Sequence, residues 1–417
     1  MIRMHILCLQ VFLAGVVAVT NVTPQDGWNW TSARAEDALR PEVGKPLQAA
    51  QELLKAQKYK EALAKVNEAD AVGGKSAYES FIIERMRGAA AAGAGDTAAA
   101  VKAFEATIAS GRLPAAEQLK LMEALAGTAY RGKDYAKAQT WAQRYIREGG
   151  TSSSMRTLLS QAQYLAGDYA GAAKELTAES AATEQAGHAP AEDRLQLLAN
   201  CHLKLNDKAG YASVLEKLVT HHPKKEYWAD LLARVQRKPG FSSRLSLDVY
   251  RLMRATGNLQ DTSDFIEMAQ LALQAGLPAE AKKTVDDGYA RGALGTGAEA
   301  DRHKRLRDLA NKQVADDQKG MAEAEKQANA AKDGNALVAL GYVYVTNAQF
   351  EKGIALLEQG IAKGNLKRPE DAKLHLGVAY LQAGNKAKAQ QSLRSVQGGE
   401  GAADLARLWL IQGGRTS

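Results

Sequence analysis

The stretch NALVALGYVYVTNAQFEKGIALLEQGI, residues 335–361, decides the fold because its apolar and small residues recur at helical spacing. Leu340, Gly341 and Tyr344 follow Leu337 after three, four and seven residues, so the four residues share one face of a helix. Gly341 leaves room on that face for a second helix to cross closely. We therefore predict a helix that pairs with a neighbour through this face.

The second half of the stretch supplies that neighbour. The turn TNAQF, residues 346–350, interrupts the first helix, and Phe350 is expected to plug the turn with an apolar side chain. Gly353, Leu357 and Ile361 follow at four-residue spacing and line the inner stripe of a second helix. A single hairpin cannot bury this stripe alone, so the pattern predicts hairpins stacked into a solenoid.

The same rhythm recurs along the chain. Gly353 is a small residue three positions after an aromatic one, and comparable small residues are Ala62, Ala100, Ala138, Ala172, Ala281 and Ala389. The steps from Ala62 to Ala172 are 38, 38 and 34 residues, and the step from Gly353 to Ala389 is 36. The wider gaps hold weaker members at Tyr211, near Ser246 and at Gly320. Ten helical hairpins with a period in the mid-thirties are predicted.

This pattern resembles the tetratricopeptide repeat (TPR) family, in which Leu-Gly or Leu-Ala and then Tyr precede a turn and a second helix. One matching unit consists of Leu337, Leu340, Gly341, Tyr344, Phe350, Gly353 and Leu357. Others contain Leu376, Gly377, Tyr380, Gly384, Ala389 and Leu393, or Leu195, Leu198, Ala199, Leu215 and Pro223. The match covers roughly residues 43–396, with degenerate units at 225–260 and 300–333. The resemblance, which extends to exported bacterial TPR proteins, implies an all-α fold, a right-handed α-solenoid of about ten antiparallel helix pairs.

The N-terminus is typical of an exported protein. MIRMHILCLQVFLAGVVAVT, residues 1–20, has Arg3 near its start and then an uncharged apolar run. We expect a signal peptide within residues 1–35, cleaved after Ala18 or after Ala35, and hence a periplasmic or exported protein. The alternative is a chain tethered to the membrane by an uncleaved N-terminal anchor. Beyond this leader we expect no membrane span.

The remaining chain is expected to contain two arrays. The first is a TPR-like array at 36–290, and the glycine-rich residues 291–300 are a flexible joint. A second array at 301–412 ends in an amphipathic capping helix, 402–412, whose Leu405, Leu408, Trp409 and Ile411 cover the last hairpin. Residues 413–417 form a tail. One continuous array with a long loop at 291–300 is equally consistent with the sequence.

Side chains able to do chemistry are sparse. Cys201 and His202, with His221 and His222 two turns beyond the next bend, lack the close pairing that a zinc site needs. Cys201 shows no activating surroundings, and the glycines of 291–300 lack the strand and Lys-Ser/Thr of a phosphate loop. The basic run DRHKRLRD, residues 301–308, is better explained as a solvated helix face than as a nucleic-acid site. We expect no enzyme activity, no catalytic or metal-binding residues, no cofactor and no nucleic-acid partner.

The resemblance implies a concave groove lined by the first helix of each pair. In the units beginning near 119, 153 and 192, eight groove positions are polar, basic or aromatic: Lys120, Tyr130, Arg131, Gln161, Tyr164, Gln196, Asn200 and Lys204. Asn200 and Lys204 match the family's carboxylate clamp, but the equivalent ninth positions elsewhere are Gly127 and Gln161. In the C-terminal units Val338, Tyr342, Leu374 and Val378 predict a more apolar groove.

Two functions from different classes fit these features. The first is a periplasmic adaptor that binds an extended peptide or a helix of an envelope protein in its groove. The second is a structural scaffold of an envelope assembly, secretion or polysaccharide-export complex, bound through its ends or its convex face. The full sequence carries a formal charge of +7, and loss of Arg3, Asp26 and Arg34 with the leader would leave about +6. That mildly basic balance favours acidic partners. Other envelope or secreted proteins are the expected partners, and the oligomeric state is not predicted.

Overall fold

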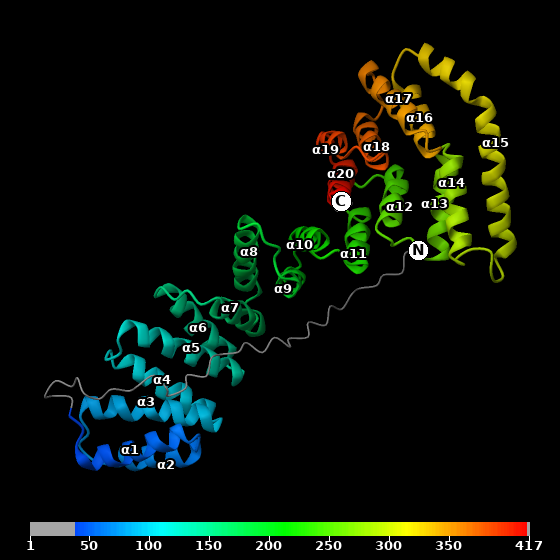
Figure 1. Cartoon of the computed structure of the whole chain (residues 1–417). Helices are drawn as coiled ribbons and strands as arrows, with labels where there is room; N and C mark the ends of the chain where they lie inside the picture. The colour runs from blue at the N-terminus through cyan, green and yellow to red at the C-terminus, as the bar shows by residue number, and fades with distance from the viewer. Residues whose placement is uncertain (1–37, 415–417) are drawn as a thin grey trace. The chain divides into compact units, whose positions relative to one another are not determined.

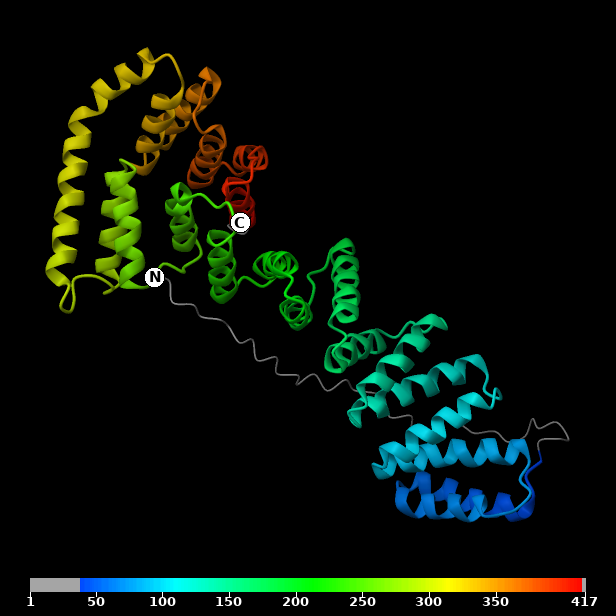
Figure 2. The same ribbon diagram turned by 180° about the vertical axis from the view of Figure 1, so that it is seen from behind.

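The computed structural model describes residues 38–414, whose regular structure comprises twenty α-helices and the short 3₁₀ turn η2 (Ser243–Leu245). This part of the chain forms two compact units, residues 38–211 and residues 212–414. Figures 1 and 2 show the helices from two sides. No helix within residues 38–414 has the length and apolar character needed to cross a bilayer. The predicted leader lies outside the described residues.

The first unit is a series of helix hairpins in which each helix contacts the next along the chain. Its helices are α1 (Pro41–Lys55), α2 (Tyr59–Asp70), α3 (Ala77–Ala94), α4 (Thr97–Ala109), α5 (Ala115–Arg131), α6 (Tyr135–Arg147), α7 (Ser153–Ala166), α8 (Tyr169–Gln185) and α9 (Glu192–Lys204). The first helices of successive hairpins begin at residues 41, 77, 115, 153 and 192, which confirms the predicted period.

The second unit begins within α10 (Lys208–His221). Its other helices are α11 (Lys225–Gln236), α12 (Ser246–Ala255), α13 (Thr262–Gln274), α14 (Pro278–Ala290), α15 (Ala300–Ala330), α16 (Asn335–Thr346), α17 (Phe350–Lys363), α18 (Pro369–Gln382), α19 (Lys386–Arg394) and α20 (Ala402–Gly413). Seven hairpins therefore precede α15 and two follow it.

Five of the hairpin turns are closed by the same side-chain cap. Asp134 accepts a hydrogen bond from the Lys137 amide at 3.1 Å, which satisfies one of the unpaired N–H groups at the start of α6. The same bond recurs, at 2.9 to 3.2 Å, from the Ala99, Gly171, Gly210 and Lys388 amides to Asp96, Asp168, Asp207 and Asn385. The Asp or Asn before α4, α6, α8, α10 and α19 therefore fixes where that helix begins.

Aromatic side chains pack beside these turns. Tyr130 and Tyr135 meet edge to face across one turn with ring centroids 5.5 Å apart, and Tyr164 and Tyr169 do so at 5.3 Å across the next. Such edge-to-face pairs add about 0.5–1.5 kcal/mol beyond the area that they bury. The aromatic residue that begins the second helix is thus an apolar plug, as predicted.

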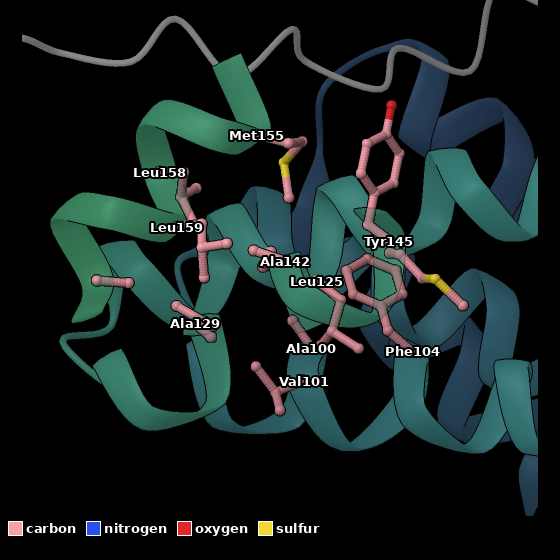
Figure 3. Close-up of a cluster of buried hydrophobic side chains, with 14 of the residues drawn as sticks. Ala100, Val101, Phe104, Leu125, Ala129, Ala142, Tyr145, Met155, Leu158 and Leu159 are labelled. Carbon is pink, nitrogen blue, oxygen red and sulfur yellow. The ribbon is translucent and has the colours of Figure 1, made fainter. Parts of the chain in front are cut away.

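The core of the first unit is built from small and large side chains in alternation (Figure 3). Ala100, Ala138 and Ala142 are fully buried, and they leave room for Phe104, Leu125 and Leu158. The predicted small positions Ala62, Ala172, Ala281 and Ala389 are also fully buried. Burial of each large aliphatic or aromatic side chain is worth about 1.5–3 kcal/mol. The small residues therefore set the close helix spacing that makes this burial possible.

The stretch that predicts the fold forms the closely packed hairpin α16/α17. A Cβ at Gly341 would lie 2.8 Å from the Gly353 carbonyl oxygen, and a Cβ at Gly353 would lie 2.7 Å from the Gly341 carbonyl oxygen. A Cβ at Gly360 would come equally close, at 2.8 Å, to the Gly334 carbonyl oxygen. Backbone contacts backbone here because none of these residues carries a side chain.

Helix α15 departs from the predicted repeat. Residues 300–330 form one continuous helix of 31 residues, where a hairpin with Gly320 as its small core residue was predicted. Gly320 is exposed, and a Cβ there would have no atom within 4 Å. The segment has no turn residues able to stop the helix, so an isolated glycine is accommodated at a cost of about 1 kcal/mol.

The boundary between the two units also differs from the predicted one. The units meet at residues 211 and 212, whereas the predicted joint, 291–300, lies inside the second unit and links α14 to α15. Leu294 in this loop is 2% exposed, and the Gly295 amide donates to His303 Nδ1 at 3.1 Å. These contacts hold the loop against the second unit, so it does not separate two arrays.

Helix α20 buries Leu405, Leu408 and Trp409, while the predicted cap residue Ile411 stays partly exposed. It contacts α18 and α19 and also α12, at the other end of the unit. The Ser242 amide donates to the Glu400 carbonyl oxygen at 2.9 Å. The second unit therefore closes on itself, and its cap joins the last hairpin to the beginning of the unit.

Candidate functional site

The predicted groove residues lie on three first helices of the first unit. Lys120, Tyr130 and Arg131 belong to α5, Gln161 and Tyr164 to α7, and Gln196, Asn200 and Lys204 to α9. The Tyr130 hydroxyl donates to Gln161 Oε1 at 3.4 Å, and Arg194 of α9 donates to Ser160 Oγ of α7 at 2.7 Å. Side chains thus connect α5 to α7 and α7 to α9.

Several of these residues are engaged with their own unit. Gln161 is only 8% exposed, so its side-chain amide bonds to Tyr130 and is poorly accessible to an outside ligand. Gln196 Nε2 donates to Glu192 Oε1 at 3.2 Å. Asn200 is partly exposed, but its Nδ2 atom is buried without an acceptor. In this conformation the Asn200 amide cannot donate to a peptide backbone, which weakens the carboxylate-clamp interpretation.

The more exposed groove residues are basic, and two tyrosines lie among them. Lys120, Arg131 and Lys204 are exposed, and Tyr130 and Tyr164 are half-buried. Burial raises the pKa of both tyrosine hydroxyls, so the rings stay neutral at physiological pH. This face can offer flat apolar contact next to positive charge.

Cys201 and His202 have structural roles on α9. Cys201 is fully buried, and burial raises the pKa of its thiol to about 12, so the reactive thiolate is absent at neutral pH. His202 Nδ1 lies 2.9 Å from Asp207 Oδ2. Asp207 itself caps α10 through the Gly210 amide, so His202 supports the turn.

In the second unit a buried charge cluster connects four helices. Arg251 of α12 donates from Nη1 to Asp248 Oδ1 at 2.7 Å and from Nη2 to Glu280 Oε2 of α14 at 2.6 Å. Its guanidinium lies 4.7 Å from the ring centroid of Tyr342 of α16. His375 of α18 stacks on Tyr342 at 4.4 Å and places Nε2 3.0 Å from Asp248 Oδ1.

Mutual pairing keeps this cluster charged despite its burial. Burial by itself would raise the pKa of Asp248, but His375 and Arg251 hold it well below its usual range. Burial likewise opposes the ionised form of Glu280, whose pKa Arg251 lowers. Burial raises the pKa of the Tyr342 hydroxyl, so that residue stays neutral. A buried network of this kind is stable only while each charge keeps its partner.

Next to this cluster lies a trough of about 1250 Å³. Its walls come from α12, α13, α15, α16 and α18. Figure 1 shows α15 passing from α14 to α16 along the outer side of the unit, and α15 contacts both helices. We call this space the second-unit trough and define it by Leu271, Asp317, Met321, Val338, Tyr342 and Val343 together with the acidic residues described next.

The charges that line the trough are unequal. Four carboxylates line the trough, those of Asp248, Glu267, Asp316 and Asp317. Only two guanidinium groups line it, those of Arg244 and Arg251. Both arginines are already paired, Arg251 as above and Arg244 with Asp371 at 2.8 Å. Partial burial raises the pKa of Asp317. The lining therefore has an excess of negative charge.

The sequence anticipated only part of this trough. Val338 and Tyr342 line it, as the predicted apolar groove requires, but Leu374 and Val378 are fully buried in the core and are unavailable to a ligand. The spacing within 300–333 favours a degenerate hairpin, so it does not predict the contribution of α15 to the trough. Its signal was nevertheless present, since Asp317, Met321, Ala324 and Ala328 recur at spacings of four, three and four residues.

Similarity to known proteins is found among solved structures. No protein-family model and no curated protein matches the chain. Similar solved structures include the TPR2AB domain of yeast Sti1 in its complex with pHSP90, at 16% identity and a TM-score of 0.33 over 64% of this chain and 98% of that one. Yeast Tom70 is similar at 13% identity and a TM-score of 0.26, over 89% of this chain and 94% of that one.

The TPR domain of P58(IPK) is similar at 13% identity and a TM-score of 0.22, over 90% of this chain and 99% of that one. These scores are low, so the assignment rests on the hairpins of the chain itself. Their first helices recur every 33 to 39 residues from α1 to α13, each followed by an antiparallel second helix packed through small residues. The chain is therefore a TPR-like α-solenoid protein.

Proposed function

We propose that this chain is a non-enzymatic protein–protein interaction module, a periplasmic adaptor that holds an extended peptide or a helix of an envelope protein. The binding face is the one formed by α5, α7 and α9 in the first unit. The observation that carries this proposal is the hydrogen bond of 3.4 Å between Tyr130 and Gln161. Because these two residues come from different hairpins, their contact supports a continuous face across the consecutive first helices α5 and α7.

The chemistry of this face suits an acidic ligand. Arg131 and Lys204 are exposed cations able to form charge-assisted hydrogen bonds with carboxylates. Tyr130 and Tyr164 supply rigid contact area at a low cost in conformational entropy. A partner segment with carboxylate side chains, or a terminal carboxylate, would therefore be favoured over a basic one.

Export is the second part of the proposal. The apolar run after Arg3 supports a signal peptide that delivers the mature chain to the periplasm. N-terminal sequencing of the exported protein tests this directly and distinguishes cleavage after Ala18, cleavage after Ala35 and an uncleaved anchor. Recovery of the chain only in the cytoplasm would contradict it.

The binding test uses charge reversal with a matched control. A partner captured from envelope extracts is titrated against the chain and against the triple variant Lys120→Glu, Arg131→Glu and Lys204→Glu. The control carries Lys60→Glu, Lys102→Glu and Lys174→Glu, which change exposed lysines on the second helices α2, α4 and α8. We expect at least a tenfold loss of affinity in the first variant and little change in the control.

The scaffold alternative gives the opposite pattern. If the partner binds the chain through its ends or its convex face, reversal at Lys120, Arg131 and Lys204 leaves its affinity unchanged. Crosslinks between the chain and the partner would then map to the second helices or the terminal hairpins. That outcome would replace the adaptor by a structural scaffold of an envelope assembly, secretion or polysaccharide-export complex.

A further inference from the structure

We infer that the second-unit trough is a separate docking site and that its occupant is one basic amphipathic helix of a partner protein. This site is independent of the face formed by α5, α7 and α9. It belongs to the other unit, is lined by other helices, and carries the opposite charge. The inference rests on the charge, the apolar surface and the size of the trough.

Charge selects a basic occupant. Among the described residues, Glu267 and Asp317 have no ion-pair partner, and Asp316 has only an exposed contact of 3.7 Å with Lys319. The trough arginines are committed to partners of their own, so they leave these carboxylates uncompensated. Lysine or arginine side chains of an incoming segment would provide the missing positive charge.

Apolar side chains line the space between these carboxylates. Leu271 of α13, Met321 of α15, and Val338 and Val343 of α16 all line the trough and stay partly exposed. Ala324, Ala336 and Ala339 add small side chains that allow a close approach. Covering this surface would be favourable by about 25 cal/mol for each Å² removed from water. The occupant therefore needs an apolar stripe as well as a basic flank.

Size and hydrogen bonding favour a helix. The trough, with a volume of about 1250 Å³, is open to solvent and is large enough to receive part of a helix about 10 Å across. The walls are helices whose backbone groups bond within themselves, so no strand edge is available to an extended peptide. A helix satisfies its own backbone and can present apolar residues at i, i+3, i+4 and i+7.

The proposal is testable because the trough is expected to prefer a basic peptide to an acidic one. The chain as a whole is basic, with a formal charge of +7, so nonspecific attraction would favour an acidic peptide. A preference of the second unit for a basic helix would therefore report the local charge of the trough. It would weaken with added salt, because surface charge interactions are screened.

The experiment uses the full chain and two synthetic helices of about four turns. One has leucines at i, i+3, i+4 and i+7 flanked by lysines, and the other has glutamate in place of every lysine. We expect the lysine peptide to protect α13, α15 and α16 from hydrogen exchange. Equal protection by the glutamate peptide, or protection by the lysine peptide only in the first unit, would overturn the proposal.

Two matched variants test whether the trough carboxylates attract the lysine peptide. Glu267→Gln, Asp316→Asn and Asp317→Asn together remove three trough carboxylates that are exposed or half-buried, so the fold should be retained. The control, Glu351→Gln, Asp301→Asn and Asp308→Asn, removes the same groups from exposed positions outside the trough.

We expect the trough variant to bind the lysine peptide at least tenfold more weakly than the control, since three charge pairs with the peptide are lost together. Equal affinity of the two variants for the lysine peptide would overturn the assignment. Circular dichroism and the hydrogen exchange of the free variants verify that both are folded. Because the test does not involve α5, α7 or α9, its failure would leave the proposed adaptor function untouched.

Discussion

Arg251 of α12 and Glu280 of α14 form a bidentate ion pair, with Nη2–Oε2 and Nε–Oε1 distances of 2.6 and 3.0 Å, and both residues are less than 5% exposed. Arg251 also binds Asp248, which in turn contacts His375 of α18. These bonds join helices that are far apart in sequence. The closure of the second unit therefore depends on buried charges as well as on apolar packing.

Removing one member of this pair should loosen the second unit. Glu280→Gln leaves the Arg251 guanidinium buried with only Asp248 to balance it, and loss of one partner from a buried pair costs about 3–5 kcal/mol. We expect faster hydrogen exchange in α12 and α14 and unchanged exchange in α3 and α5. The control is Glu299→Gln at the exposed pair with Arg302, where under about 1 kcal/mol is expected. Equal effects of the two substitutions would contradict the role of the cluster.

Two glycines should respond to alanine in opposite ways. Gly341→Ala would drive a Cβ to 2.8 Å from the Gly353 carbonyl oxygen, so we expect α16/α17 to lose about 1–3 kcal/mol. Gly320→Ala places its Cβ in open space on α15, and a gain of about 0.5–1 kcal/mol is expected. Local free energies of opening from hydrogen exchange measure both. Stabilisation by Gly341→Ala would show that the helices are not in close contact.

Glu79 should make α3 sensitive to acid. Hydrogen bonds from Arg40 outweigh burial and, with the Ser76 amide, lower the pKa of Glu79 from 4.5 to about 2. A carboxyl group with a lowered pKa contributes stability above its unfolded value, and the contribution is lost as pH falls through the folded value. The stability difference between the native chain and Glu79→Gln should therefore shrink between pH 4.5 and about 2. Hydrogen exchange of α3, measured at several pH values in both proteins, reports this difference. A difference that does not change with pH would contradict the pairing of Glu79 with Arg40.

The thiol of Cys201 should be inert in the folded chain. The residue is fully buried, and its pKa is raised to about 12. In a Cys8→Ser background, which leaves Cys201 as the single cysteine, we expect an aromatic disulfide reagent to react only at the rate at which α9 opens. Urea should accelerate the reaction in parallel with unfolding. Rapid labelling of the native chain would show that α9 is not packed as described.

The repeat could be predicted because its signals are local. Ala62, Ala100 and Ala138 recur at a fixed step, and each reports a close helix contact within one hairpin. The groove positions on α5 and α7 follow from the same register, and the contact between Tyr130 and Gln161 agrees with it. Sequence spacing does not reveal how deeply each side chain is buried. Gln161 and the Nδ2 atom of Asn200 are both buried although they occupy predicted groove positions.

The second unit was harder to predict because its closure depends on distant partners. Arg244 and Asp371, whose side chains are 2.8 Å apart, are separated by 127 residues, and no periodicity links them. Gly320 has the spacing of a small core residue but lacks the turn that would make it one. The long helix α15 and the acidic trough beside it therefore emerge only from tertiary packing.

The central claim is that the first helices of the first unit bind a protein ligand. Hydrogen exchange of the full chain, with and without its captured partner, tests this claim most directly. The account predicts that the partner slows exchange in α5, α7 and α9, and that the triple variant Lys120→Glu, Arg131→Glu and Lys204→Glu abolishes the effect. Protection confined to the second helices α6, α8 and α10, or protection that persists in this variant, would contradict it.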